Sequence, residues 1–298
     1  MKNKPWLIGI LIFIFVVCMA FVVAIGIWVV SLQNRPPSSL NNDSGYYVRG
    51  SKVYYLGGFP STAFEIENAD AGAFQIIDSQ YAFDNARVYF DGTAIPDSDP
   101  STFEVLEQHF SHDARHVYLS GQIFTDDPIN FEILAEDLSR DREHIYWSGY
   151  TISDDPTHLE IIFSQDHYTY INDSKTVYVN GGPIVEADVN TFEVFSAGYA
   201  RDASQIYYFD QAMSADPNTF EVLEIPYSRD SQNVFWMENQ IKNADPQTFR
   251  ILNSNFECSA DLKIAFYQDQ PIPNFDPNTI PSGSQVTNCD INGMYFSP

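Results

Sequence analysis

The first 32 residues and the rest of the chain differ in their pattern of hydrophobic and polar positions. Leu7 to Val30 form a run of 24 residues without a charge, a proline or an asparagine. Because a helix rises about 1.5 Å per residue, this run can cross a hydrocarbon core of roughly 30 Å. A secretory signal peptide is the alternative, but its apolar region is only about 7–15 residues long and ends at a small-x-small site, which is missing here. The pattern predicts an uncleaved transmembrane helix over residues 7–32.

The charges beside this segment predict its orientation. Lys2 and Lys4 precede it, whereas Arg35 is the only basic residue close behind it. Because positive residues are retained on the cytoplasmic side, residues 1–6 are expected in the cytoplasm and the bulk of the chain in the periplasm or outside the cell. Residues 33–45 are rich in Pro, Ser and Asn and are expected to form a linker.

Beyond residue 46 the chain alternates apolar runs and polar turns with a period of about 29 residues. One signature is an aspartate followed by a polar stretch, a β-branched residue and an aromatic residue. Its aspartates are 29, 28, 32, 29, 28 and 31 residues apart: Asp84, Asp113, Asp141, Asp173, Asp202, Asp230 and Asp261. A second signature, Asp-Pro-x-Thr-Phe-Glu-Val-Leu, lies between them and is clearest at Asp99 and Asp216. Two signatures in constant order predict tandem copies of one unit over residues 46–298.

Each copy is expected to be a small β-meander. The aspartate of the first signature can accept a hydrogen bond from the backbone two residues on and so close a hairpin turn. Glycines after the following strand suit a second turn with positive φ: Gly92, Gly121, Gly149 and Gly181. In the second signature the aspartate can cap a short helical turn that begins with proline. Because such units bury their apolar faces against neighbours, we predict an all-β array, either an open solenoid or a closed propeller-like ring.

Aromatic residues recur at fixed places in these units. One expected ladder comes from the first signature: Tyr89, Tyr118, Tyr146, Tyr178, Tyr207, Phe235 and Phe266. A second comes from the second signature: Phe103, Phe131, Leu159, Phe192, Phe220 and Phe249. The residues that would face the other side of the strands either form an exposed strip for sugars or peptides, or are buried in sheets covered on both faces: Tyr55, Phe90, Trp147, Tyr208 and Trp236.

Cysteine use predicts one disulfide. Cys18 lies within the predicted span, and Cys258 and Cys289 are the two cysteines beyond it. In an oxidising compartment such a pair is expected to be bonded. Cys258 replaces the apolar residue that stands three positions before the turn aspartate in the other copies, so the disulfide is expected to cap the last repeat.

The copy from Tyr199 to Leu223 carries a resemblance to a known family. Its turn aspartate, its Ile-Tyr-Tyr strand and its Ala-Asp-Pro-Asn-Thr-Phe-Glu-Val-Leu segment resemble the DKNYY repeat family, and related copies cover about residues 46–280. This sequence has Ala, Ser, Asn or Arg where that family often has lysine. The resemblance implies a bacterial, membrane-anchored envelope protein, and it supplies no catalytic residues.

Charge restricts the class of partner. All 40 acidic residues lie beyond the predicted span, together with only 13 of the 15 basic residues, so that part carries a formal charge of −27. Nucleic acids and anionic membrane surfaces carry the same sign and are disfavoured as partners. A protein or a glycan partner remains, besides the membrane reached through the helix.

The sequence holds no motif that specifies catalysis or a cofactor. Its six histidines show no zinc spacing, and serine and cysteine nucleophile motifs are missing. Acidic pairs before the second signature, such as Asp97 with Asp99 and Glu186 with Asp188, indicate either capping or calcium. We therefore expect a non-catalytic binding or scaffold module without a cofactor. The alternative is a glycosidase-like envelope hydrolase with a carboxylate site, which would lie in the irregular segment Gln165 to Asp173 with Asp166 and His167.

Overall fold

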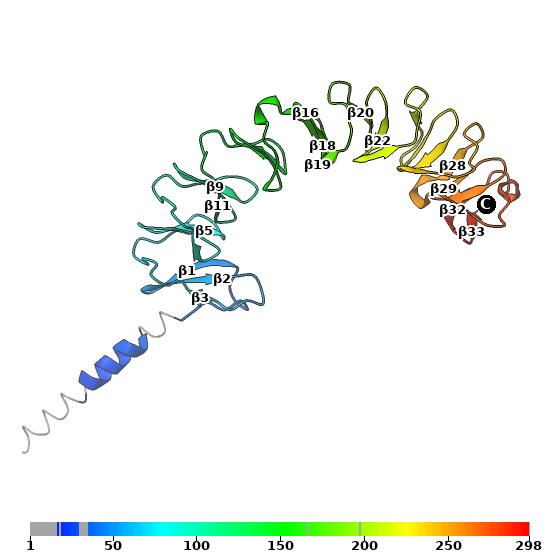
Figure 1. The fold of residues 1–298 in the computed structure, drawn as a ribbon. Helices are drawn as coiled ribbons and strands as arrows, with labels where there is room; N and C mark the ends of the chain where they lie inside the picture. Colours follow the sequence, from blue (N-terminus) through cyan, green and yellow to red (C-terminus); the bar gives the residue numbers. More distant parts are fainter. Residues whose placement is uncertain (1–16, 18, 30–34, 166, 197, 298) are drawn as a thin grey trace, which may run out of the picture. The chain divides into compact units, whose positions relative to one another are not determined.

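The computed structural model describes residues 17, 19–29, 35–165, 167–196 and 198–297 (Figure 1). Residues 19–29 are helical. Within this described part of the chain, no helix combines the length and apolarity that crossing a membrane requires. The predicted cytoplasmic segment 1–6 and much of the predicted span, namely residues 7–16, 18 and 30–32, lie outside the described residues.

The chain divides into two compact units, Met1–Phe131 and Glu132–Pro298. In the described part of the first unit, three antiparallel sheets follow one another, and each is a meander whose consecutive strands pair. The first sheet consists of β1 (Gly45–Arg49), β2 (Lys52–Leu56) and β3 (Phe64–Glu65). The second consists of β4 (Gln75–Ile76), β5 (Tyr81–Phe83), β6 (Val88–Phe90) and β7 (Thr93–Ala94). The third consists of β8 (Glu104–Val105), β9 (Phe110–His112), β10 (Val117–Leu119) and β11 (Gln122–Thr125).

The second unit continues the same pattern. Its four-stranded sheets begin with β12 (Glu132–Ile133), β13 (Leu138–Arg140), β14 (Ile145–Trp147) and β15 (Tyr150–Ser153). The next sheet consists of β16 (Glu160–Gln165), β17 (Tyr168–Asn172), β18 (Val177–Val179) and β19 (Gly182–Ile184). It is followed by a sheet of β20 (Glu193–Ser196), β21 (Tyr199–Arg201), β22 (Ile206–Tyr208) and β23 (Gln211–Met213). Another sheet consists of β24 (Glu221–Val222), β25 (Tyr227–Arg229), β26 (Val234–Trp236) and β27 (Asn239–Gln240). The last four-stranded sheet consists of β28 (Arg250–Asn253), β29 (Cys258–Ala260), β30 (Ala265–Tyr267) and β31 (Gln270–Pro271). A two-stranded sheet, β32 (Gln285–Asp290) with β33 (Gly293–Ser297), ends the unit.

Each four-stranded sheet corresponds to one sequence repeat. In each of the seven four-stranded sheets of the described residues, the turn aspartate lies between the second and third strands. In six of them the second signature leads into the first strand, and in four a glycine turn lies between the third and fourth strands. The predicted helical turn after Asp-Pro is a 3-10 helix at η1 (Pro156–His158) and, near the end of the chain, at η3 (Pro277–Thr279). Another 3-10 helix, η2 (Ser254–Phe256), lies between β28 and β29. The expected all-β meander is therefore found in every repeat.

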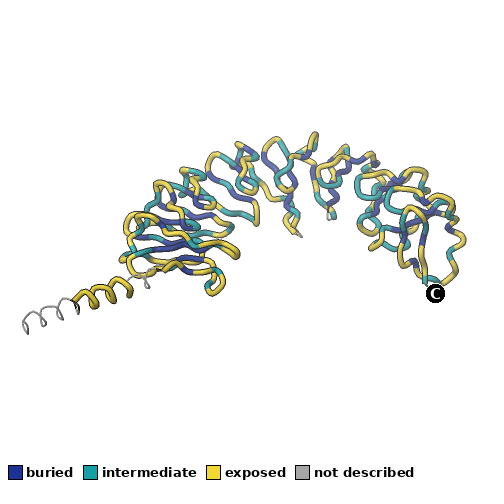
Figure 2. Tube along the Cα trace, turned by 90° about the horizontal axis from the view of Figure 1, so that it is seen from below, coloured by how far each residue is buried: buried dark blue, intermediate teal, exposed yellow. Residues whose placement is uncertain are grey.

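Consecutive residues of the central strands supply two different cores. Ala200 and Tyr207 pack with residues of the preceding sheet, whereas Tyr199 and Ile206 pack with residues of the following sheet. Neighbouring side chains of a strand point to opposite faces, so each such sheet is covered on both sides. Figure 2 shows the result as short buried stretches that recur along the trace between exposed turns.

Ring contacts show how residues of the two signatures pack between sheets. Phe192 of the second signature lies between Tyr170 of the preceding sheet, at 6.2 Å between ring centroids, and Tyr207 of its own sheet, at 5.7 Å. The same order links Tyr81, Phe103 and Tyr118. Residues of the two predicted ladders therefore meet within each of these cores, because the second signature enters the space between two sheets.

The predicted aromatic strip is covered by the turn glycines. A Cβ added to Gly181, which has a φ of +76°, would lie 2.3 Å from Cγ of Trp147 in the preceding sheet. Gly92 approaches Tyr55 in the same way. Tyr55 is buried, and the other four members of the strip are half-buried. Of the two alternatives, the structure favours sheets packed on both faces.

Candidate functional site

The buried turn aspartates form the most regular polar feature of the molecule. One oxygen of Asp202, Oδ1, accepts the backbone N–H of Ser204 at 2.7 Å and that of Gln205 at 2.8 Å. This arrangement closes the central hairpin turn. The same pair of bonds is made by each turn aspartate: Asp84, Asp113, Asp141, Asp173, Asp202, Asp230 and Asp261.

The second oxygen joins the turn to the core and to the connection between sheets. Oδ2 of Asp202 accepts the phenol O–H of Tyr207 at 2.8 Å and the backbone N–H of Asp188 at 3.0 Å. A tyrosine donates in the same way to Asp84, Asp113, Asp141 and Asp173. Asp230 and Asp261 precede Phe235 and Phe266, whose rings carry no hydroxyl.

Threonine of the second signature completes this network. Thr191 donates its hydroxyl to Asp188 at 2.9 Å and accepts the N–H of Ala203 at 3.1 Å. We call this set of Asp188, Thr191 and Asp202 the aspartate latch. Thr102, Thr219 and Thr248 make the same two bonds in other repeats. The two sequence signatures are therefore the two halves of one hydrogen-bonded structure.

Hydrogen bonds keep the carboxylate of Asp202 ionised. Burial acts to raise the pKa of Asp202, but hydrogen bonds from the backbone of Asp188 and Ser204 and from Tyr207 outweigh it and lower the pKa to about 2. The pKa is also lowered, through the same opposing contributions, at Asp84, Asp113, Asp173 and Asp230. Burial and the bond to Asp84 raise the pKa of Tyr89 to about 12. At neutral pH the latch thus pairs a carboxylate with a neutral phenol.

The acids considered for calcium lie in hydrogen-bonded turns. Asp188 accepts bonds from Asn190 and Thr191, and Asp126 pairs with Nδ1 of His116 at 2.7 Å. Calcium sites in proteins gather six to eight oxygen ligands. In the part of the chain that the structure describes, no three His, Cys, Asp or Glu side chains are grouped so as to hold a metal ion. Asp188 thus acts as a hydrogen-bond acceptor in its turn, and calcium binding by the acidic pairs stays a prediction.

The irregular segment considered for a hydrolase is a hairpin. β16 and β17 pair antiparallel, with Gln165 opposite Tyr168. His167 lies at the tip with a φ of +68°, and its carbonyl accepts a bond from Asn180. Asp166 lies outside the described residues. The longer step between Asp141 and Asp173 therefore lengthens two strands.

The structure contains cross-strand ion pairs that the sequence analysis did not predict. Arg201 pairs with Glu193 at 2.5 Å and faces it across β20 and β21. Arg229 with Glu221 and Arg140 with Glu132 occupy the same register. The signal was present as a Glu directly after the Phe of the second signature and an Arg directly before the turn aspartate.

The disulfide and a hollow lie together at the end of the second unit. Sγ of Cys258 and Sγ of Cys289 are 2.08 Å apart, and the bond joins β29 to β32. Beside it, Arg250 to Asn253 of β28 and residues 280–286 line a hollow of about 600 Å³. The predicted cap is therefore a two-stranded sheet held against the last four-stranded sheet.

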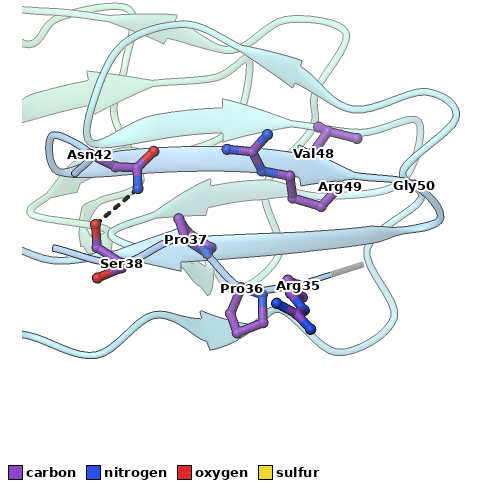
Figure 3. Close-up of a pocket in the computed structure, with 8 residues that line it drawn as sticks. All are labelled: Arg35, Pro36, Pro37, Ser38, Asn42, Val48, Arg49 and Gly50. Carbon is purple, nitrogen blue, oxygen red and sulfur yellow. Dashed lines mark hydrogen bonds between the residues drawn. The ribbon is translucent and has the colours of Figure 1, made fainter. Parts of the chain in front are cut away.

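A second hollow, of about 660 Å³, lies at the start of the first unit (Figure 3). Arg35, Pro36 and Pro37 form one side, and Val48 and Arg49 of β1 lie across from them. Asn42 closes one end by donating to the carbonyl of Ser38. Ser38 also bridges to Thr62, so part of the predicted linker is attached to the first sheet.

Comparison with known proteins identifies the repeats. A family model described as the DKNYY family matches four overlapping stretches, namely residues 38–122, 110–239, 139–270 and 227–294. No curated protein and no solved structure matches the chain.

Proposed function

The chain belongs to the DKNYY family, and from that premise we propose that it is a membrane-tethered repeat protein of the cell envelope that binds a protein or a glycan without catalysing a reaction. The proposed tether is the apolar segment 7–32, and the proposed orientation places the repeats outside the cytoplasm. The repeats supply the binding surface.

The observation that carries this proposal is a constant frame with variable exposed turns. Every central turn is closed by the same aspartate, but the three residues after it differ from repeat to repeat and are exposed or half-exposed. They read Ala-Arg-His after Asp113, Arg-Glu-His after Asp141 and Ala-Ser-Gln after Asp202. Repeat proteins bind extended partners by varying exposed positions on a fixed frame.

The buried carboxylates support the non-catalytic part of the proposal. A glycosidase needs two carboxyl groups that flank a substrate. The turn aspartates are instead buried and bonded to backbone N–H groups of their own turns. The lowered pKa of Asp202 suits a permanent hydrogen-bond acceptor and is opposite to the raised pKa of a general acid.

A pull-down of the tagged full chain from native envelopes tests the proposal. We expect one reproducible partner, whose recovery falls when the exposed Arg115 and Arg142 are replaced together by alanine. The matched control replaces Arg49 and Lys242, which are exposed and lie outside the three residues that follow each turn aspartate. Recovery of no partner, combined with turnover of a glycan panel by the same preparation, would contradict a non-catalytic binding role. Protease protection of the repeats in right-side-out cells would contradict the proposed orientation.

A further inference from the structure

The last repeat breaks the row of cross-strand ion pairs in a specific way. The position directly after the aromatic residue or leucine of the second signature is glutamate in five repeats: Glu104, Glu132, Glu160, Glu193 and Glu221. In the last repeat this position is Arg250, so its charge is reversed. Arg250 faces Ala260, whereas Glu193 and Glu221 face the arginines with which they pair. Both members of the usual ion pair are therefore changed at once.

Arg250 is left without an acidic partner at the mouth of a hollow. Its side chain is exposed, and within the described residues no carboxylate forms an ion pair with it. The lining of the hollow contains no Asp or Glu at all, although the chain has 40 of them. A single arginine in an acid-free wall is a local positive site in a strongly acidic protein.

The rest of the lining combines apolar residues, such as Ile280 and Pro281, with polar groups, and a hydrogen bond fixes one of the polar groups in place. Asn253 donates its amide to the carbonyl of Val286 at 2.8 Å and thereby ties β28 to β32. Figure 1 shows these strands together with β29 and β33 in one group at the C-terminal end. Ser282, Ser284 and Gln285 add hydroxyl and amide groups to the same lining as Arg250. The Cys258–Cys289 disulfide holds the strand that forms this wall.

We infer that this hollow is a binding site for a ligand that presents a carboxylate to Arg250. A guanidinium offers a planar pair of N–H donors that matches a carboxylate, and the serine and amide groups suit the polar remainder of such a ligand. The overall negative charge of the protein does not prevent this, because exposed charges are screened over about 8 Å at physiological ionic strength. The inference deepens the proposed binding function by naming a ligand class, but it does not depend on the membrane tether.

Titration of the detergent-solubilised full chain with N-acetylglycine tests the assignment. We expect saturable binding that weakens about tenfold or more in Arg250→Ala, because a charge-assisted hydrogen bond is lost. Arg250→Glu, which restores the charge of the other repeats, is expected to abolish binding. Arg49→Ala removes another exposed arginine, in the first unit, and is expected to leave affinity unchanged. The thermal midpoint of each variant shows whether the fold is intact.

Two further probes identify the chemistry. N-acetylglycinamide has the same shape without the charge, and equal binding of this amide would overturn the assignment. Inorganic phosphate is the competing oxyanion, and tighter binding of phosphate than of N-acetylglycine would overturn the choice of carboxylate. Unchanged affinity in Arg250→Ala would show that the hollow is not the site. A partner recovered in the pull-down whose binding resists Arg250→Ala would support the proposed function and contradict this inference alone.

Discussion

The backbone N–H of Asp188 donates to a carboxylate oxygen of Asp202 at 3.0 Å, across 14 positions of sequence. Asp188 belongs to the connection between two sheets, and Asp202 closes the central turn of the second of them. One buried carboxylate thus fixes both the turn of a sheet and the path by which the chain enters it. This bond explains why the two signatures occur in constant order.

Removing this carboxylate is expected to destabilise the second unit. Asp202→Ala leaves the partly buried N–H groups of Asp188, Ser204 and Gln205 without their acceptor, and a hydrogen bond to a charged group contributes about 1.5–3 kcal/mol. We expect a loss of about 3 kcal/mol or more in the free energy of unfolding, measured by urea titration of the full chain. Asp210→Ala, which removes an exposed acid next to β22, serves as the control. Equal losses in the two variants would contradict the latch.

The latch also predicts a pH dependence. The folded-state pKa of Asp202 is lowered to about 2, below the value of about 3.9 for an aspartate in an unfolded chain. The carboxylate therefore contributes its full stability above about pH 4, and that contribution is lost as the pH falls towards 2. Asp202→Asn has no such charge to lose. We expect the difference in thermal midpoint between wild type and Asp202→Asn to shrink from pH 5 to pH 2, and a constant difference would refute the assignment.

The contribution of the tyrosine hydroxyl to stability can be tested by removing it in one repeat and adding it in another. Tyr207→Phe removes the O–H that Asp202 accepts, and we expect a loss of about 1 kcal/mol. Phe235→Tyr would place a hydroxyl at the corresponding position beside Asp230, which now accepts the N–H of Asp216 and a longer bond from Asn233. We expect a gain of up to about 1 kcal/mol there. Urea midpoints that move in the same direction for both variants would contradict equivalent roles.

The repeat, its β-meander and its turns could be predicted because they depend on local chemistry. Asp202 closes a turn with N–H groups two and three residues away, and Gly181 supplies the positive φ that its turn requires. Both turns depend only on residues that lie next to one another in the sequence. The pairing of Cys258 with Cys289 followed from there being no other cysteine beyond the predicted span.

The packing between repeats could not be predicted because it depends on which sheet each face meets. Tyr207 and Tyr208 are adjacent, yet Tyr207 packs towards the preceding sheet and Tyr208 towards the following one. The partner of Thr191 is the N–H of Ala203, which lies in the other signature. The regular spacing predicted that both signatures recur, but only the fold shows that Thr191 and Ala203 are hydrogen-bonded to each other.

The glycine turns predict a steric cost that can be separated from backbone strain. Gly181→Ala places a Cβ at positive φ and against the ring of Trp147, whereas Gly283→Ala places one at a φ of +86° with no atom within 4 Å. Positive φ costs about 1–2 kcal/mol, and overpacking adds about 1–3 kcal/mol. We therefore expect Gly181→Ala to lower the free energy of unfolding more than Gly283→Ala. Adding Trp147→Ala to Gly181→Ala should remove part of the excess, and a purely additive double variant would contradict the contact.

The disulfide predicts that the C-terminal cap is held by a covalent constraint. The two cysteines are 31 residues apart, and closing a loop of that length stabilises the folded state by about 3–4 kcal/mol in the chain-entropy model. Cys258 and Cys289 also pack with Val286 and Met294 in the last core, so their loss would release β32 and β33. We expect Cys289→Ser to increase hydrogen exchange in residues 285–297 while β20 to β23 stay protected. The reason is that each repeat of a repeat protein is stabilised mainly by contacts with its immediate neighbours. Reduction with dithiothreitol should reproduce the effect in the wild type and leave the variant unchanged. Equal exchange in the oxidised and reduced wild type would show that core packing alone holds the cap.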